Sequence, residues 1–220
     1  MKTYKEILEN FDSQSLELID HILNKLLPEL FPDEGNTQML EKLKPIIEGY
    51  IAEKEIREKV VTYLTYIFFQ SDIQFQYNGK YWYQMEIKYQ EKFEKDNYNY
   101  PFDGHGLPPA QIEKKLSLQK EKEMRALLII KDKEDKVFFW NWLDILDSKQ
   151  FMFTKTKARK IYPLKNYNKA LTTNDLKEQL RNTLEDDTDR KSNKNIKQGL
   201  QTNHKIHKLI RGIKRWEKII

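Results

Sequence analysis

The sequence predicts an α/β fold in which helices flank a central mixed β-sheet, with a helical addition before it and a basic helix after it. Three patterns support this prediction: an alternating hairpin, a helix and strands that follow it, and helical periodicity near both ends. The predicted parts are an N-terminal helical region at 1–50, a core at 51–165, and a polar linker with a basic amphipathic helix at 166–220.

The hairpin is predicted over residues 72–89. Polar and apolar residues alternate on both sides of Asn78-Gly79, a dipeptide that favours tight hairpin turns. A strict two-residue turn would put the apolar residues of the two arms on different faces. We therefore expect a three-residue connection or a bulge between Tyr77 and Lys80.

The polar face of this hairpin is a candidate metal site. The predicted register places Asp72 roughly across from Gln84 and diagonal to Glu86. Two converging carboxylates repel each other unless a cation lies between them, and hard oxygen ligands favour Mg²⁺ or Mn²⁺. Lys88 would share this space, where it could orient or deprotonate a water or stabilise charge on a phosphate. The alternative is an amphipathic hairpin with a solvated polar face.

The segments after the hairpin supply the rest of the predicted sheet. Residues 108–116 predict the start of a helix. Residues 125–130 form an aliphatic run that predicts a buried strand, and the aromatic residues 137–142 predict a strand that completes the sheet. The charged residues 131–136 would form the turn between these two strands.

This succession resembles the core of the PD-(D/E)xK nuclease superfamily, which has the restriction-endonuclease-like fold. The features that carry the resemblance are Asp72, the hairpin, Glu86-Ile87-Lys88, a helix with an early glutamine and an aliphatic strand, over about residues 55 to 146. The resemblance implies a Mg²⁺- or Mn²⁺-dependent nuclease with nucleic acid, expected to be DNA, as substrate. It implies metal binding by Asp72, Glu86 and the carbonyl of Ile87, catalysis assisted by Lys88, and positioning by Gln111.

Some details of the family pattern differ or stay open. Ser71 occupies the position of the proline in the family name, and Lys115 stands where some members have a tyrosine after the glutamine. The family often adds an acid from the helix before the first strand. Within residues 52–69 this acid would be Glu58 rather than Glu55, because Glu58 begins an apolar stretch. An ordinary glutamate on a helix surface is the alternative.

Composition limits the class of protein. The chain has 220 residues, and its 39 Lys and Arg exceed its 34 Asp and Glu, which gives a net charge of +5 and favours polyanionic partners. It has no cysteine, which excludes disulfides and thiolate metal sites and fits the reducing cytoplasm. No apolar run or leader predicts a membrane span or a signal peptide.

The region 94–109 predicts a long loop because it is rich in turn-forming residues. Its aromatic residues Tyr98, Tyr100 and Phe102 could stack on bases of an unpaired strand, and His105 could act as a general acid or contact a phosphate. The alternative is a loop anchored by its aromatic residues, with His105 an ordinary surface histidine.

The last third of the chain is rich in charge. Residues 151–164 mix aromatic and basic residues, which suits either a strand that follows phosphates or a protected sheet edge. Residues 185–195 predict a flexible linker. Residues 204–220 predict an amphipathic helix that could bind nucleic acid, a partner or the body of the protein.

Two other classes of function remain open. The same fold could be a non-catalytic nucleic-acid-binding or assembly module held by its basic tail. Alternatively, the helices at both ends could be docking surfaces for a protein partner or a homodimer. Residues 1–50 suit either such a docking unit or a helical layer on the core.

Overall fold

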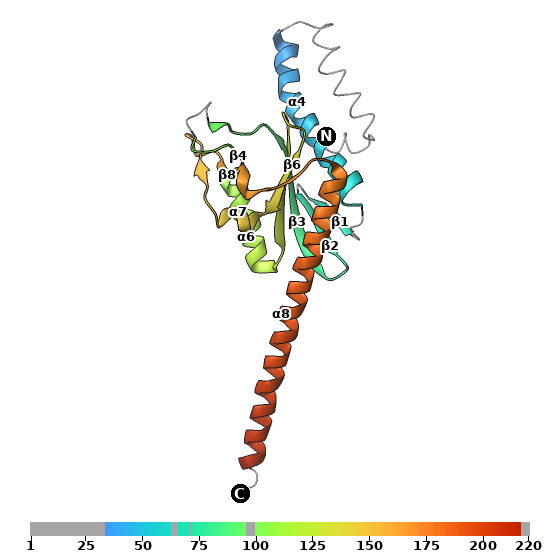
Figure 1. The fold of residues 1–220 in the computed structure, drawn as a ribbon, viewed down its shortest axis with the longest axis vertical. Coiled ribbons are helices and arrows are strands. Elements are labelled where there is room, and N and C mark those ends of the chain that lie inside the picture. Colours follow the sequence, from blue (N-terminus) through green and yellow to red (C-terminus); the bar gives the residue numbers. More distant parts are fainter. Residues whose placement is uncertain (1–33, 63–65, 71, 96–99, 217–220) are drawn as a thin grey trace. The chain divides into compact units, whose positions relative to one another are not determined.

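The computed structural model describes the backbone of residues 34–62, 66–70, 72–95 and 100–216, and the side chains of residues 44–62, 73–95 and 100–195. The chain divides into two compact units, one ending at Glu178 and one formed by Gln179–Ile220. Both sheets lie in the first unit (Figure 1). Of the predicted N-terminal helical region, residues 1–33 lie outside the described residues.

A mixed sheet forms the centre of the first unit, as the sequence predicts. Its strand order is β1-β2-β3-β5-β6-β9. β5 is parallel to β3, and the other neighbouring pairs are antiparallel. The strands are β1 (Tyr66–Gln70), β2 (Asp72–Tyr77), β3 (Tyr81–Gln90), β5 (Arg125–Asp132), β6 (Phe138–Trp142) and β9 (Asn168–Ala170).

The β2–β3 hairpin confirms the predicted three-residue connection. Tyr77 pairs with Tyr81, and three residues join them. The φ angles of Asn78 and Gly79 are +50° and +65°, which Asn and Gly tolerate better than other residues. The backbone N–H of Lys80 donates to the carbonyl of Tyr77 at 3.2 Å and closes the turn.

The register of this hairpin differs from the predicted one. Gln74, not Asp72, lies across from Gln84, and the last pair is Ile73 with Met85. Continued by one residue, this register brings Asp72 level with Glu86. The difference arises because the connection comprises residues 78–80, whereas a pairing of Asp72 with Gln84 would require a connection at residues 77–79.

Helices cover both faces of the sheet. α6 (Pro109–Lys122) and α7 (Leu143–Asp147) pack on one face, where Ile112 of α6 joins a buried cluster with Leu128 and Ile130 of β5. α4 (Glu34–Glu55) lies against β3 on the other face. There Lys131, which follows Ile130 and so points the opposite way, forms an ion pair with Glu55.

The α4 face of the sheet is also a buried core. Phe75 and Tyr83 stack with ring centroids 5.6 Å apart, and Tyr83 lies 5.7 Å from Trp142. Burial of each such side chain stabilises the fold by about 1.5–3 kcal/mol. Six residues of β2, β3 and β5 on this face are almost fully buried: Ile73, Phe75, Tyr83, Met85, Leu127 and Ile129.

The residues before β1 form only the first part of the helix expected over 52–69. α4 ends at Glu55, a five-residue π-helix η2 (Ile56–Val60) follows, and β1 begins at Tyr66. The run of aromatic and β-branched residues at 66–69 favours a strand, and here it pairs with β2.

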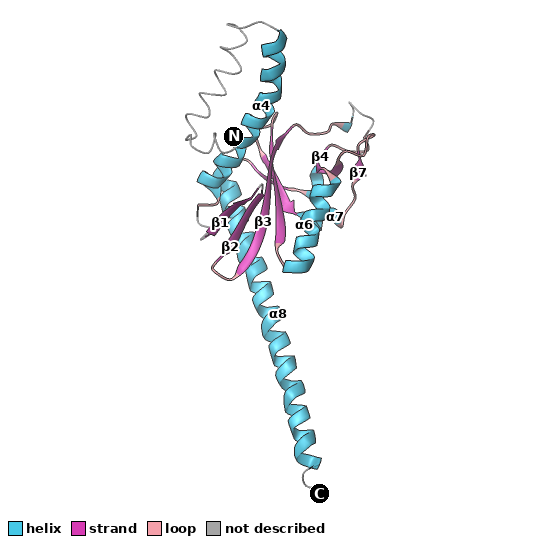
Figure 2. Cartoon of the chain, turned by 180° about the vertical axis from the view of Figure 1, so that it is seen from behind, coloured by secondary structure: helices cyan, strands magenta, loops and turns pink. Residues whose placement is uncertain are grey.

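A second, three-stranded sheet corrects the prediction of a loop over 94–109. It contains β4 (Gly104–Leu107), β8 (Lys160–Pro163) and β7 (Met152–Phe153) in the order β4-β8-β7, and Figure 2 shows β4 and β7 beside α7. Gly104 and Gly106 serve close packing here, because a Cβ atom on either would lie 2.2–2.3 Å from a carbonyl oxygen of β8.

α8 (Thr173–Trp216) replaces the flexible linker expected at 185–195. Thr172 and Asp175 form a capping box at its start, with bonds of 3.1 and 3.0 Å. Ion pairs one turn apart, such as Lys191 with Asp187 at 3.3 Å, support its charged middle part. The helix predicted at 204–220 is helical through Trp216, and residues 217–220 lie outside the described part. No described helix is long and apolar enough to cross a membrane.

Candidate functional site

Glu86 is the centre of the candidate site. It lies in β3, its side chain is only 4% exposed, and two ammonium groups flank its carboxylate. Lys88 Nζ lies 2.5 Å from Oε1, and Lys115 Nζ lies 2.7 Å from Oε2. A buried carboxylate needs such partners to remain ionised, and the two ammonium groups provide them.

Lys115 is a residue of the site whose contact with Glu86 was not predicted from the sequence. It lies on α6, and its side chain is 2% exposed. Gln84 fixes it from the sheet side, because Gln84 Nε2 donates to the carbonyls of Lys115 and Met124 at 3.2 and 2.8 Å. The available signal was its position three residues after Ile112, on the apolar side of the helix, where an unpaired lysine would be costly.

Asp72 is the first residue of β2, at the end of the strand that lies level with Glu86. Its side chain is not among those described. The structure therefore relates Asp72 to Glu86 only through the backbone register of β2 and β3. The pairing between β2 and β3 ends at Met85, and β3 continues to Gln90.

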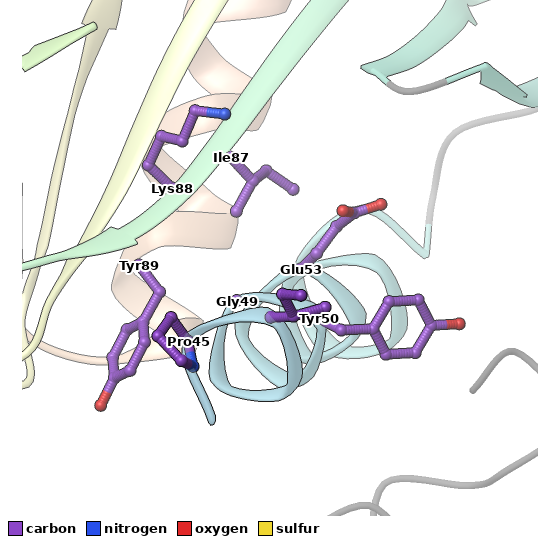
Figure 3. Close-up of a pocket in the computed structure, with 8 residues that line it drawn as sticks. Pro45, Gly49, Tyr50, Glu53, Ile87, Lys88 and Tyr89 are labelled. Atoms are coloured by element: carbon purple, nitrogen blue, oxygen red, sulfur yellow. The ribbon is translucent and has the colours of Figure 1, made fainter. Parts of the chain in front are cut away.

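A pocket of about 320 Å³ lies between α4 and this last part of β3 (Figure 3). Glu53 and Gly49 of α4 and Lys88 of β3 contribute to it. Figure 3 shows the helix on one side and the strand on the other. The complete lining is Pro45, Ile46, Gly49, Tyr50, Glu53, Ile87, Lys88 and Tyr89.

The glutamates before β1 differ in their surroundings. Glu58, the preferred third acid, is 44% exposed and lies 3.7 Å from the Lys54 ammonium. Glu55 forms its ion pair with Lys131. Glu53 is the acid of α4 that lines the pocket with Lys88, and it also lies 3.6 Å from Arg57. Pro45, Gly49 and Glu53 are spaced four residues apart, which places them on one face of a helix, and this spacing could have identified Glu53 as a residue that lines the pocket.

The remaining predicted residues lie on either side of this centre. Gln111 is exposed in the first turn of α6, where its backbone N–H donates to the carbonyl of Pro108. Lys115, one turn later, is the residue of this helix that reaches Glu86. Ile87 lines the pocket.

His105 is fully buried, which corrects both interpretations of it as a substrate-contacting or a surface residue. Its Nε2 lies 3.1 Å from Asp132 Oδ2, and the side-chain amide of Gln90 lies 3.3 Å from its Nδ1. Tyr167 donates its hydroxyl to the His105 carbonyl at 3.1 Å. These contacts join β4 of the small sheet to the ends of β3 and β5, so His105 serves the fold. Of the loop aromatics, Tyr98 lies outside the described residues, and Tyr100 packs against Phe93 at 6.4 Å.

The pKa of Asp132 is lower than its ordinary value of 3.8. Burial acts in the opposite direction, but the interaction with His105 and the backbone N–H groups of Asp135 and Glu134 favours the ionised form more strongly. Both N–H groups donate to Asp132 Oδ1 at 2.8 Å. Ionised Asp132 therefore stabilises the β5–β6 turn and its link to the small sheet.

This lowered pKa predicts an acid-sensitive contribution to stability. The contribution is complete at pH values above the ordinary carboxyl pKa and is lost as the pH falls through the lower pKa of the folded state. We expect Asp132→Asn to be less stable at pH 7 by about 1–3 kcal/mol, with a shallower loss of stability between about pH 4 and pH 2. Urea unfolding across this pH range tests this, and parallel curves for the two proteins would contradict it.

The fit of a divalent cation rests on Glu86 and the position of Asp72. Among the described side chains, no three His, Asp or Glu residues converge on one point. Lys88, whose side chain is 30% exposed, can leave Glu86 Oε1 more easily than the buried Lys115 can leave Oε2. One carboxylate oxygen of Glu86 would then be open to a hard cation.

No protein-family model, curated protein or solved structure matches the chain. The function must therefore be inferred from the geometry of the site.

Proposed function

We propose that the protein is a Mg²⁺- or Mn²⁺-dependent nuclease that hydrolyses phosphodiester bonds in DNA. The observation that carries this proposal is the Glu86–Lys88 ion pair at the point where β3 extends beyond its pairing with β2. The same register, continued by one residue, would bring Asp72 opposite Glu86. The succession of β2, β3, α6 and β5 also supports the resemblance to PD-(D/E)xK nucleases.

Each residue has a distinct role in the proposed reaction. Asp72, Glu86 and the carbonyl of Ile87 would hold the metal ion, which supplies Lewis-acid stabilisation of the phosphate and an activated water. Lys88 would exchange its contact with Glu86 for one with the attacking water or a phosphate oxygen. Lys115 would remain on Glu86 Oε2 and keep the carboxylate ionised and oriented when Lys88 leaves.

The pocket between α4 and β3 lies on the opposite face of β3 from the Glu86–Lys88 ion pair, so it would hold a part of the substrate away from the reacting phosphate. Its volume of about 320 Å³ lies at the lower end of the range of ligand pockets, about 300–1,000 Å³. Tyr89 lies at this pocket, and the ammonium groups of Lys133 and Lys136 lie 5.2 and 5.4 Å from its ring. Because Lys133 is also paired with Glu48 and Glu53 lines the pocket, a planar base of a DNA strand would suit these surroundings better than a phosphate.

Gly49 provides a test of the pocket, because a Cβ atom there would meet no other atom within 4 Å. We expect Gly49→Ala to keep activity and to stabilise α4 by up to about 1 kcal/mol. Gly49→Leu should also favour the helix but fill the pocket, and so raise KM for DNA several-fold. Thermal unfolding and cleavage kinetics measure both effects. Equal KM values for the two variants would show that substrate does not enter the pocket.

The proposal is tested by incubating the protein with supercoiled plasmid, single-stranded DNA and RNA in Mg²⁺, Mn²⁺ or EDTA. Cleavage of DNA that requires the metal is the expected result. Preferential cleavage of RNA would keep the chemistry and change the substrate. No cleavage of any of the three under any condition would count against the nuclease.

The second candidate is a non-catalytic nucleic-acid-binding or assembly module on the same fold. The observation that favours it is the contact of Glu86 with two lysines, which already neutralise the charge that a metal would neutralise. Salt-sensitive DNA binding that is unaffected by EDTA and by Glu86→Ala, without cleavage, would identify this function.

A further inference from the structure

Two phenylalanines are exposed on the β7–β8 hairpin, which we define as residues 149–160. Phe151 and Phe153 have 40% and 44% of their surface exposed. Their ring centroids are 5.7 Å apart and the rings are nearly perpendicular. Both belong to the small group of large apolar residues that are exposed in the described part of the chain. Such side chains mark a surface that can bind a partner.

The charge of this hairpin is of one sign. It contains Lys149, Lys155, Lys157, Arg159 and Lys160 and no Asp or Glu, whereas the whole chain has 39 basic and 34 acidic residues. Lys160 pairs with Asp147, and its ammonium lies 3.6 Å from the centroid of the Phe151 ring. The other three lysines are exposed. Two exposed aromatic residues therefore lie between basic residues on one short segment.

The turn of the hairpin is held by its own hydrogen bonds. The backbone N–H of Thr154 donates to the carbonyl of Arg159 at 3.0 Å, and that of Lys157 donates to the carbonyl of Thr154 at 2.8 Å. Lys157 has a φ of +56°, a conformation that glycine adopts at lower cost. The turn thus holds two lysine positions, 155 and 157, at a defined place beyond the phenylalanines.

We propose that this hairpin binds single-stranded nucleic acid, with Phe151 and Phe153 stacking on unpaired bases and the exposed lysines contacting phosphates. Aromatic side chains within a basic surface bind single strands in this way without requiring a particular sequence. A protein partner fits less well, because lysine is depleted in the centres of protein interfaces. The binding needs neither a metal ion nor Glu86, so it is independent of the proposed hydrolysis.

The test measures fluorescence anisotropy of labelled oligo(dT) with the full-length protein in EDTA, which prevents metal-dependent cleavage. We expect F151A/F153A to weaken binding by about tenfold or more, as loss of base stacking does. Leu171→Ala removes another exposed apolar side chain, 64% exposed, and should leave affinity unchanged. If the double variant does not fold, F151L and F153L remove the aromatic rings while keeping apolar side chains of moderate size.

A charge variant tests the phosphate contacts separately. K155Q/K157Q should reduce the slope of log K against log salt by about 1.4, since each contact to a single strand contributes about 0.7. K120Q/K122Q removes two exposed lysines from α6 and should leave the slope unchanged. Unchanged oligo(dT) affinity in F151A/F153A would overturn the proposal. The proposal would also be overturned if the wild-type protein bound anionic phospholipid vesicles but not oligo(dT), and if F151A/F153A abolished the vesicle binding.

Discussion

Glu86→Gln is expected to reduce metal-dependent DNA cleavage by about a thousandfold or more. The amide keeps the size of the side chain but removes the charge that would bind the cation. A metal ion contributes several kcal/mol of transition-state stabilisation, and each 1.36 kcal/mol is a factor of about ten in rate. Initial rates of plasmid nicking in Mg²⁺ measure the effect, and circular dichroism establishes that the variant is folded.

Matched variants separate this effect from a general loss of charge. Asp72→Asn should reduce cleavage to a similar extent, because both carboxylates would bind the same ion. Glu113→Gln makes the same chemical change at an exposed position of α6 and should leave the rate unchanged. A Glu86→Gln protein that is folded and cleaves as fast as Glu113→Gln would remove Glu86 from the mechanism.

Lys115→Met is expected to cost the largest amount of stability, about 3 kcal/mol. Methionine fills a similar space but removes the cation from a buried ion pair, which leaves the carboxylate of Glu86 with less compensation. Lys88 still contacts Glu86 Oε1, so the effect should be at the lower end of the range of about 3–5 kcal/mol for such losses. Urea unfolding at pH 7 provides the measurement.

The neighbouring lysine is a natural control for this variant. Lys114 is exposed, so Lys114→Met should change stability by less than about 0.5 kcal/mol. Combining Lys115→Met with Glu86→Gln should recover part of the lost stability, because neither charge then remains buried without its partner. Equal stabilities of the Lys114 and Lys115 variants would mean that the buried pair contributes nothing.

Local patterns were sufficient to predict β2, β3, β5 and β6 of the central sheet, but not its outer strands β1 and β9. Alternation over 72–89 and the Asn78-Gly79 turn determine the hairpin, and the aliphatic and aromatic runs at 125–130 and 137–142 form β5 and β6. These signals succeed because strand and turn geometry depend on neighbouring residues. The predicted register was wrong because the three-residue connection comprises residues 78–80, one position later than a pairing of Asp72 with Gln84 requires.

Features that depend on distant residues were missed. Gly104 and Gly106 indicated a turn, but they permit the close approach of β8, which comes more than fifty residues later in the sequence. The polar residues at 185–195 indicated a linker, but a capped helix with charged pairs includes them. In each case, composition suggested one conformation and tertiary or helical context selected another.

The candidate site also contains some contacts that the sequence predicts and others that depend on the packing of distant elements. Glu86 and Lys88 share a face because they are two positions apart on a strand, which the sequence shows directly. The approach of Lys115 and the lining of the pocket by Glu53 depend on how α6 and α4 pack on β3. Periodicity alone does not fix that packing.

The most direct test of the proposed nuclease is the nicking of supercoiled plasmid by the wild-type protein and Glu86→Gln, each in Mg²⁺ and in EDTA. The account predicts open-circular and linear DNA only for the wild-type protein with Mg²⁺. Nicking that persists in EDTA or in a folded Glu86→Gln protein, or no nicking by the wild-type protein in Mg²⁺, would contradict it.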